Sequence, residues 1–166
     1  MTPTTLTAQC RIDTPLGPMT AAATAKGLAG LWFDGQAHHP GVLVAPTDAE
    51  QRWLKIAFTS LARYFKGDPQ PLKNLPLDLQ GTPFQRAVWQ ALLDLPAGRT
   101  GTYGGIATLV GSPTAVRAVG AAVGRNPVSV LVPCHRVLGA SGALTGYAGG
   151  LDRKRALLRH EGVALT

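Results

Sequence analysis

A cluster of prolines divides the sequence into two parts of similar length. Three prolines fall within eight positions, namely Pro69, Pro71 and Pro76. Proline fixes its own φ angle and has no backbone N–H to donate, so neither a helix interior nor a central strand accommodates such a stretch. The sequence therefore predicts a linker over about residues 68–80, between an N-terminal domain in residues 1–80 and a second domain in residues 81–166.

The first part has the pattern of a small antiparallel sheet followed by one helix. Short strand-forming runs at residues 9–13, 19–24 and 28–33 are separated by turn residues. Residues 47–50 have the pattern of a capping box, which predicts the start of a helix, and Gly67 marks its end. Apolar residues recur at helical spacing in between: Trp53, Leu54, Ala57, Phe58, Leu61 and Phe65.

The second part is predicted to be mainly helical. Residues 82–85 combine a capping hydroxyl, a proline in the first turn and a glutamine at the third position, and so predict a helix start. Two short helices follow, at about residues 103–110 and 113–123, with Ser112 as the cap and Pro113 as the first residue of the second helix. This is helix-turn-helix spacing, which also occurs in folds that do not bind DNA.

The second of these helices is unusually slim. Val116, Val119 and Val123 form its predicted buried stripe, and small residues fill most of the rest: Ala118, Gly120, Ala121, Ala122 and Gly124. Glycine in a helix costs about 0.5–1 kcal/mol relative to alanine, which a close approach of another surface would offset. That surface is either a neighbouring helix or a nucleic-acid groove, and a minor groove about 6 Å wide would require such slimness.

A thiol stands beside an imidazole and a guanidinium at the end of an apolar run. Residues 128–132 are apolar and rich in valine, which predicts a short buried strand that leads through Pro133 to Cys134. The neighbouring His135 and Arg136 would lower the pKa of a cysteine from its usual value of about 8.5, so Cys134 is a candidate nucleophile. The alternative is an inert thiol in the core, because free cysteine is among the most buried residue types.

Positive charge is concentrated in the second part. The formal net charge is +7, and residues 81–166 contain nine Lys and Arg against three Asp and Glu. Eight of those nine basic residues are arginine, the side chain suited to bidentate contacts with phosphates and bases. This charge pattern is compatible with a surface that binds nucleic acid and also with an ordinary solvent-exposed basic face.

The cysteine count and the hydropathy of the chain argue against a disulfide-bonded, zinc-binding, secreted or membrane protein. Cys10 and Cys134 are the only cysteines, so no disulfide framework is predicted. Cys10, His38 and His39 fall short of the four donors of a structural zinc site, and we predict no metal. Neither a signal peptide in residues 1–18 nor a membrane span is predicted, so we expect a cytoplasmic protein with reduced thiols.

The motifs around Cys134 resemble those of one family. The segment from Pro133 to Val137, Pro-Cys-His-Arg-Val, is preceded by Asn126-Pro127 and followed by Gly146-Tyr147-Ala148-Gly149-Gly150 and His160-Glu161-Gly162. This ordered set is similar to that of the methylated-DNA-protein-cysteine methyltransferases, the 6-O-alkylguanine-DNA alkyltransferases. The resemblance is close over residues 81–162. It is looser over residues 1–80, where it rests on residues 14–18 and 64–67.

The resemblance implies a fold and a function. The fold would be α+β, with a ribonuclease-H-like N-terminal sheet and helix followed by a mainly helical domain that carries the helix-turn-helix and the active-site cysteine. The protein would flip an alkylated base out of double-stranded DNA, bound through the minor groove, and transfer the alkyl group from 6-O-alkylguanine, or 4-O-alkylthymine, to Cys134. The reaction would need no cofactor and would occur once per protein molecule. The protein would be a monomer and would not associate with a membrane.

The resemblance also implies roles for individual residues. Cys134 would attack as the thiolate, His135 would act as base through a water, and Glu161 would orient the histidine. Asn126 would brace the turn, and Tyr103 would help to protonate the purine. Pocket residues would be Pro133, Val137, Tyr147, Ala148, where many relatives have serine, and Gly149.

The same resemblance implies a DNA-binding face. Arg117 would fill the space of the flipped base, and Tyr103 would crowd a backbone phosphate. Further DNA contacts would come from Thr102, Ala118, Gly120, Ala121 and Arg125. The residues alone favour a helix-surface arginine at Arg117 and a packing residue at Tyr103, and they leave Glu161 open as a solvated helix-end charge.

Other interpretations of the same residues remain open. A cysteine hydrolase could use Cys134, His135 and Glu161 with repeated turnover. A helix-turn-helix regulator could keep Cys134 in its core and bind DNA without reacting. Residues 153–155, Arg-Lys-Arg, could contact phosphates or form a solvated helix face.

Overall fold

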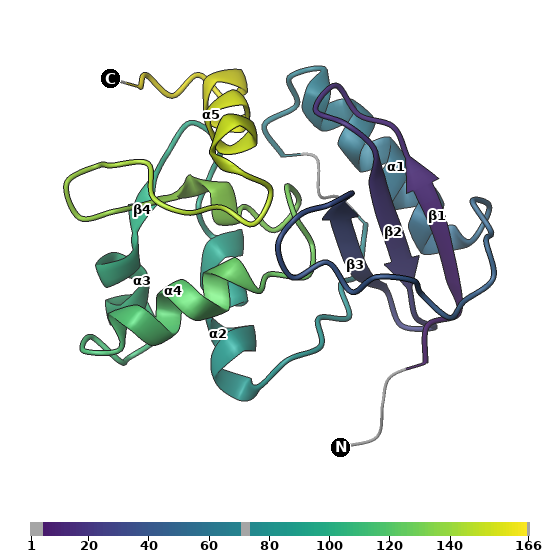
Figure 1. Cartoon of the computed structure of the whole chain (residues 1–166), viewed down its shortest axis with the longest axis horizontal. Helices are drawn as coiled ribbons and strands as arrows, with labels where there is room; N and C mark the ends of the chain where they lie inside the picture. The colour runs from purple at the N-terminus through teal and green to yellow at the C-terminus, as the bar shows by residue number, and fades with distance from the viewer. Residues whose placement is uncertain (1–4, 71–73, 166) are drawn as a thin grey trace. The chain divides into compact units, whose positions relative to one another are not determined.

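The α+β class predicted from the sequence is confirmed by a computed structural model, which describes residues 5–70 and 74–165 (Figure 1). The chain forms two compact units. The first comprises Met1–Gln80 together with Pro127–Leu131, and the second comprises Gly81–Asn126 together with Val132–Thr166. The linker expected at about residues 68–80 includes Pro71, which with residues 72 and 73 lies outside the described residues.

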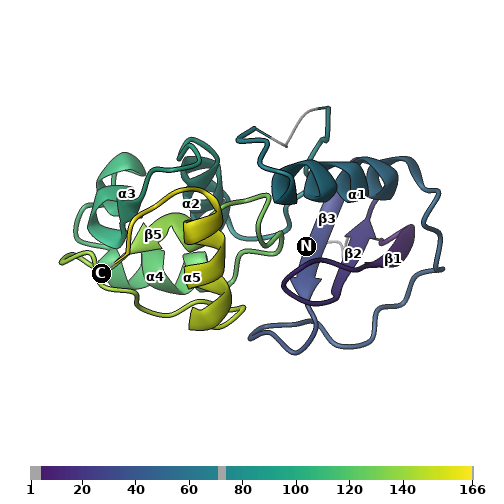
Figure 2. The same ribbon diagram turned by 90° about the horizontal axis from the view of Figure 1, so that it is seen from above.

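The first unit is built on a three-stranded antiparallel sheet. Its strands are β1 (Ala8–Ile12), β2 (Met19–Ala23) and β3 (Leu28–Phe33), in the order β1-β2-β3. Helix α1 (Arg52–Phe65) lies along one face of this sheet (Figure 2). The strands begin and end within one residue of the predicted runs, because turn-forming Pro-Leu-Gly-Pro and Lys-Gly segments separate them.

The start of α1 differs from the prediction. The capping residue is Gln51, whose Oε1 accepts hydrogen bonds from the backbone N–H groups of Trp53 at 2.8 Å and Leu54 at 3.0 Å. The expected capping box at residues 47–50 precedes the helix and does not cap it. Phe58, expected in the apolar stripe, is 57% exposed. The buried stripe follows a single 3.6-residue period instead: Leu54, Ala57, Leu61 and Tyr64.

The second unit is mainly helical. Its helices are α2 (Pro83–Leu93), α3 (Tyr103–Leu109), α4 (Val116–Gly124) and α5 (Leu151–His160), with a 3₁₀ turn, η1, at Cys134–Arg136. Two short strands, β4 (Gly101–Thr102) and β5 (Val137–Leu138), pair in parallel. The capping box predicted for α2 is confirmed: Thr82 Oγ1 accepts from the Gln85 N–H, and Gln85 Oε1 accepts from the Thr82 N–H.

Helix α4 starts three residues later than predicted. Gly111, at φ 76°, ends α3 in a Schellman arrangement in which the Ser112 N–H bonds to the Ala107 carbonyl at 2.9 Å. Ser112 therefore closes α3, and Pro113 lies in the connecting turn instead of opening α4. Val116 becomes the first residue of α4 and is 41% exposed, so it is not part of the buried stripe as expected.

The strand predicted at residues 128–132 is not formed. Only Val128 makes an isolated bridge, to Leu31, and the chain then turns sharply at Val130 and again at Pro133. The backbone N–H of Leu131 bonds to the carbonyl of Ser129, and that of Cys134 bonds to the carbonyl of Val132. These i to i+2 bonds define two γ-turns. The segment is apolar because it is buried, and burial alone does not distinguish a strand from a folded turn.

The helices of the described part of the chain are short. None of those found in residues 5–70 and 74–165 has the length and apolar character that crossing a bilayer requires.

Candidate active site

Cys134 lies at the first residue of η1, directly after a tight turn. Pro133 has φ −83° and ψ 63°, and the Cys134 N–H donates to the Val132 carbonyl at 2.8 Å. This inverse γ-turn reverses the chain just before the thiol. Cys134 is 4% exposed, and η1 then leads into β5.

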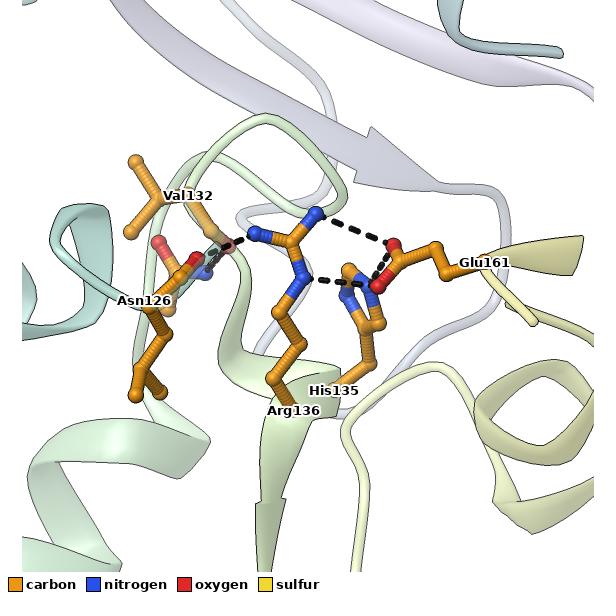
Figure 3. Close-up of polar contacts among 6 residues, drawn as sticks. Asn126, Val132, His135, Arg136 and Glu161 are labelled. Atoms are coloured by element: carbon orange, nitrogen blue, oxygen red, sulfur yellow. Dashed lines mark hydrogen bonds and ion pairs between the residues drawn. The ribbon is translucent and has the colours of Figure 1, made fainter. Parts of the chain in front are cut away.

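Glu161, the residue that follows α5, joins the two residues after the cysteine. Its Oε2 lies 2.6 Å from His135 Nε2, and its Oε1 accepts from Arg136 Nε at 2.7 Å (Figure 3). Arg136 Nη2 donates to Oε2 at 3.1 Å, and Nη1 donates to the Leu95 carbonyl. The Glu161 side chain is 2% exposed. Glu161 is therefore a buried, paired carboxylate, and not the solvated helix-end charge left open by the sequence.

The hydrogen bond to Glu161 sets the state of the histidine. An ionised carboxylate only accepts, so Nε2 carries the proton and Nδ1 has the free lone pair. Nδ1 is buried, and no polar atom of the described residues lies within hydrogen-bond distance of it. Burial lowers the pKa of His135, although Glu161 opposes this shift. The imidazole is thus a neutral base with one available nitrogen.

The electrostatics at Cys134 contradict the simplest expectation from sequence. Burial raises the pKa of the Cys134 thiol, and the hydrogen bond from Asn126 and the charge of Lys154 oppose this shift only in part. His135 is neutral and Arg136 is neutralised by Glu161, so neither adjacent residue stabilises a resting thiolate. The prediction that they lower the pKa of the cysteine is wrong, because the cost of burying the charged form is larger.

Asn126 connects the thiol to its own loop. Its Nδ2 donates to the Val132 carbonyl at 2.8 Å (Figure 3). Its side chain also hydrogen-bonds to Cys134. The residue is buried. Asn126 therefore joins the segment that follows α4 to the loop that precedes Cys134.

Lys154 is a site residue that the sequence analysis did not identify. It is 0% exposed, and its Nζ donates to the carbonyls of Val137 at 2.6 Å, Thr145 at 2.7 Å and Gly146 at 3.1 Å. It is therefore neither a phosphate contact nor part of a solvated face. Burial lowers the pKa of Lys154 to about 8, while its charge favours a thiolate at Cys134. The helical period could have revealed it, since it shares a buried face with Leu157 and Leu158.

The residues expected to line a pocket lie in the second unit, which also contains Cys134. The ring of Tyr147 meets that of His135 edge-on, with centroids 6.5 Å apart and planes at 83°. Gly149 is buried, and its carbonyl accepts from Arg153 Nη1 at 3.1 Å. Ala148 is half-buried. Pro133 and Val137 flank η1 and are buried.

The residues expected to contact DNA lie on α4 and at the start of α3. Thr102 caps α3, with its Oγ1 accepting from the Gly105 N–H at 3.0 Å, and Tyr103 is the first helical residue. Val119, Ala122 and Val123 face the core from α4. The opposite face is exposed and consists of small and basic residues: Arg117, Ala118, Ala121 and Arg125. A Cβ at Gly120 would be 3.9 Å from the Tyr103 ring, so this glycine and Tyr103 are neighbours.

Possible metal ligands do not gather anywhere in the described residues. No group of three or more His, Cys, Asp or Glu side chains suitable for a metal ion occurs in residues 5–70 and 74–165. Cys10 lies in β1 and is buried.

Two family models match the chain. Residues 83–163 match the DNA binding domain of 6-O-methylguanine DNA methyltransferase, and residues 10–79 match its ribonuclease-like domain. A curated methylated-DNA-protein-cysteine methyltransferase of Shigella flexneri is 53% identical over 163 residues, covering 93% of this chain and 95% of that protein. The corresponding protein of Mycobacterium tuberculosis is 47% identical over 150 residues, covering 90% and 89%.

Solved structures show the same fold. The crystal structure of Mycobacterium tuberculosis OGT in complex with DNA has a TM-score of 0.83 and 44% sequence identity, covering 93% of this chain and 92% of that one. A 6-O-methylguanine DNA methyltransferase from Methanococcus jannaschii has a TM-score of 0.67 and 29% identity, with 94% and 95% covered.

Proposed function

Because the chain belongs to the family of methylated-DNA-protein-cysteine methyltransferases, we propose that Cys134 is the residue that accepts the alkyl group from 6-O-alkylguanine in DNA. The protein is a DNA repair enzyme of this family. The observation that supports Cys134 as the acceptor is its place beside a buried His135–Glu161 pair whose free ring nitrogen can take a proton. Cys10, the other cysteine, lies in a strand of the other unit.

The reaction begins from two neutral groups. The thiol and the imidazole are both uncharged at rest, since burial disfavours their charged forms. One water between Cys134 Sγ and His135 Nδ1 would relay the thiol proton to the histidine. The imidazolium that forms is stabilised by Glu161, and the thiolate by the charge of Lys154 and by the hydrogen bond from Asn126. The Cys134 thiolate therefore forms during the reaction, by proton transfer to His135, and is not present at rest.

Alkyl transfer is an in-line displacement at the carbon attached to the 6-oxygen. A sulfur–carbon bond forms as the carbon–oxygen bond breaks, and the electron pair of the broken bond stays on the purine. Tyr103 donates a proton to the leaving base, which remains in the DNA as guanine. Thymine alkylated at its 4-oxygen presents the same carbon–oxygen bond. The product on the protein is a thioether, which water does not hydrolyse, so each molecule acts once.

DNA is bound through the slim face of α4. The small residues on that face allow the helix backbone to approach the minor groove closely, and the exposed arginines Arg117 and Arg125 supply positive charge. Arg117 fills the space that the flipped nucleotide leaves. A single copy suffices, because every reacting group comes from one chain. The chemistry requires a reduced thiol, as in the cytoplasm.

The acceptor is tested by measuring the mass of the protein after reaction. Duplex DNA with a single 6-O-methylguanine is titrated into the protein, and intact mass and peptide mapping follow. One methyl group should replace the thiol proton on the Cys134 peptide, and uptake should stop at one equivalent. Repeated turnover without a protein adduct would instead indicate a hydrolase. DNA binding without any adduct would indicate a regulator.

The role of Arg117 is tested by comparing two substrates. The Arg117→Ala protein should repair 6-O-methylguanine in duplex DNA about tenfold or more slowly, since it loses the side chain that replaces the flipped base. Its reaction with free 6-O-benzylguanine should be unchanged, because the free base needs no flipping. Arg63→Ala, which removes an exposed arginine on α1, is the matched control for loss of one positive charge. An equal loss with both substrates would refute the proposed role.

A further inference from the structure

A five-residue segment just before the active-site loop in sequence belongs to the other compact unit. Pro127–Leu131, here called the strap, belongs to the first unit, although Asn126 before it and Val132 after it belong to the second. The strap pairs with β3 through two backbone hydrogen bonds. The Leu31 N–H donates to the Pro127 carbonyl at 2.8 Å, and the Ser129 N–H donates to the Leu31 carbonyl at 2.9 Å.

The strap holds a strained conformation. Val130 has φ 71°, a region that β-branched residues rarely adopt, and it is buried. The Leu131 N–H bonds to the Ser129 carbonyl at 2.9 Å, which closes a γ-turn around Val130. A strained turn of this kind persists only where its surroundings determine it.

Gln36 makes a side-chain hydrogen bond to the strap. This residue follows β3 and is 7% exposed. Its Oε1 accepts from the Phe33 N–H at 2.8 Å and from Ser129 Oγ at 3.1 Å, so one oxygen joins the end of β3 to the strap. Ser129 is also buried. Removing the Gln36 side chain would remove the hydrogen bonds that join Ser129 Oγ to the end of β3.

The two ends of the strap carry groups that hold the thiol. The Asn126 side chain spans both ends by donating to the Val132 carbonyl at 2.8 Å, and it also hydrogen-bonds to Cys134. The same Val132 carbonyl accepts from the Cys134 N–H at 2.8 Å. The path of the strap therefore sets the distance between Asn126 and Val132, and with it the placement of Sγ.

We propose that Gln36 is a positioning residue for alkyl transfer, which acts by clamping the strap so that Asn126 and Val132 hold the thiol of Cys134 in place. This inference rests on the proposed function of Cys134. The hydrogen bonds of Gln36 go to Phe33, Ala37 and Ser129, and none of these residues is proposed to react or to bind DNA. Its loss should therefore slow the chemical step and leave DNA affinity unchanged.

The test separates binding from chemistry in three variants. Gln36→Ala removes the clamp, Gln36→Glu keeps the acceptor oxygen, and Gln9→Ala is the matched control. Gln9 lies in β1, and its Nε2 donates to the carbonyls of Leu43 at 3.1 Å and Ala45 at 2.8 Å, so its loss loosens the same unit away from the strap. For each variant, the dissociation constant for methylated duplex DNA and the rate constant of methyl transfer at saturating protein are measured.

Gln36→Ala should transfer the methyl group about tenfold more slowly, because the nucleophile is misplaced, with an unchanged dissociation constant. Gln36→Glu and Gln9→Ala should keep the parent rate constant. An unchanged rate constant in Gln36→Ala, or an equal loss in Gln9→Ala, would overturn the proposal.

A second measurement, the reactivity of the Cys134 thiol, tests the role of Gln36 without relying on methyl transfer from DNA. The rate at which iodoacetamide modifies Cys134 is measured against pH in the same three variants. Weaker support from Asn126 in Gln36→Ala should move this profile to higher pH, because that hydrogen bond favours the thiolate. If the parent protein accepted no methyl group, the function proposed for Cys134 would fail, yet this profile would still decide the role of the strap. Coincident profiles for Gln36→Ala and the parent would refute that role.

Discussion

A protein with Cys134→Ala should bind duplex DNA containing 6-O-methylguanine as the parent does and should accept no methyl group. The loss should be complete, because no other thiol lies in the second unit, and the groups around Cys134 are arranged to remove a proton and not to receive an alkyl group. The measurement combines the dissociation constant for the methylated duplex with the intact mass after prolonged incubation.

The matched control for this variant is Cys10→Ala. Cys10 is buried in β1, so its replacement also removes a buried thiol, but from the other unit. We expect full methyl transfer in this control. Thermal unfolding of both variants shows whether either loss reflects misfolding. A methyl group found on the Cys134→Ala protein would place the acceptor elsewhere and refute the assignment.

Replacing Glu161 by alanine should reduce both stability and repair. The carboxylate is the shared acceptor of Arg136 and His135 in a buried site. Breaking a buried ion pair by removing one partner typically costs about 3–5 kcal/mol, because the other charge remains buried without compensation. The histidine also loses the group that fixes its tautomer. Since positioned general bases contribute about 10²–10⁴-fold, methyl transfer should slow by a factor in that range. Chemical denaturation and single-turnover transfer measure the two effects.

Glu161→Gln separates orientation from charge. The amide oxygen can still accept from His135 Nε2, so the tautomer is kept, and the transfer rate should fall less than in Glu161→Ala. The stability loss should persist, because Arg136 then faces a neutral group. Equal transfer rates in the two variants would show that Glu161 does not act through orientation of the histidine.

The pH dependence of transfer has a predicted direction. Burial lowers the pKa of His135, so its neutral form persists at neutral pH and the transfer rate should fall only on acidification below the usual range of histidine. Glu161 raises this pKa, whereas burial, Arg136 and Lys154 lower it. Removing the carboxylate charge in Glu161→Gln should therefore shift the acid limb to lower pH. A shift to higher pH would contradict this arrangement of charges.

Local sequence patterns predicted the elements whose boundaries depend on near neighbours. The strands of the first sheet and the capping box at Thr82 and Gln85 were confirmed, because turns and caps are made by residues within a few positions of one another. The start of α4 was wrong, because the Ser112 N–H closes α3 by bonding to the Ala107 carbonyl and Ser112 does not cap the next helix.

At the site, the sequence by itself placed Cys134, His135 and Glu161 in one constellation, because the motifs that contain them are ordered and specific. The tertiary structure alone decided what surrounds them. Segments distant in the chain bury the thiol, so its pKa rises instead of falling, and they bury Lys154, which the sequence presented as a surface charge. Pairing with Leu31 and the contact with Gln36 turned an apolar run into a strained strap instead of a strand. Apolar character determines that a segment is buried, whereas the partners that bury it determine its conformation and its charge state.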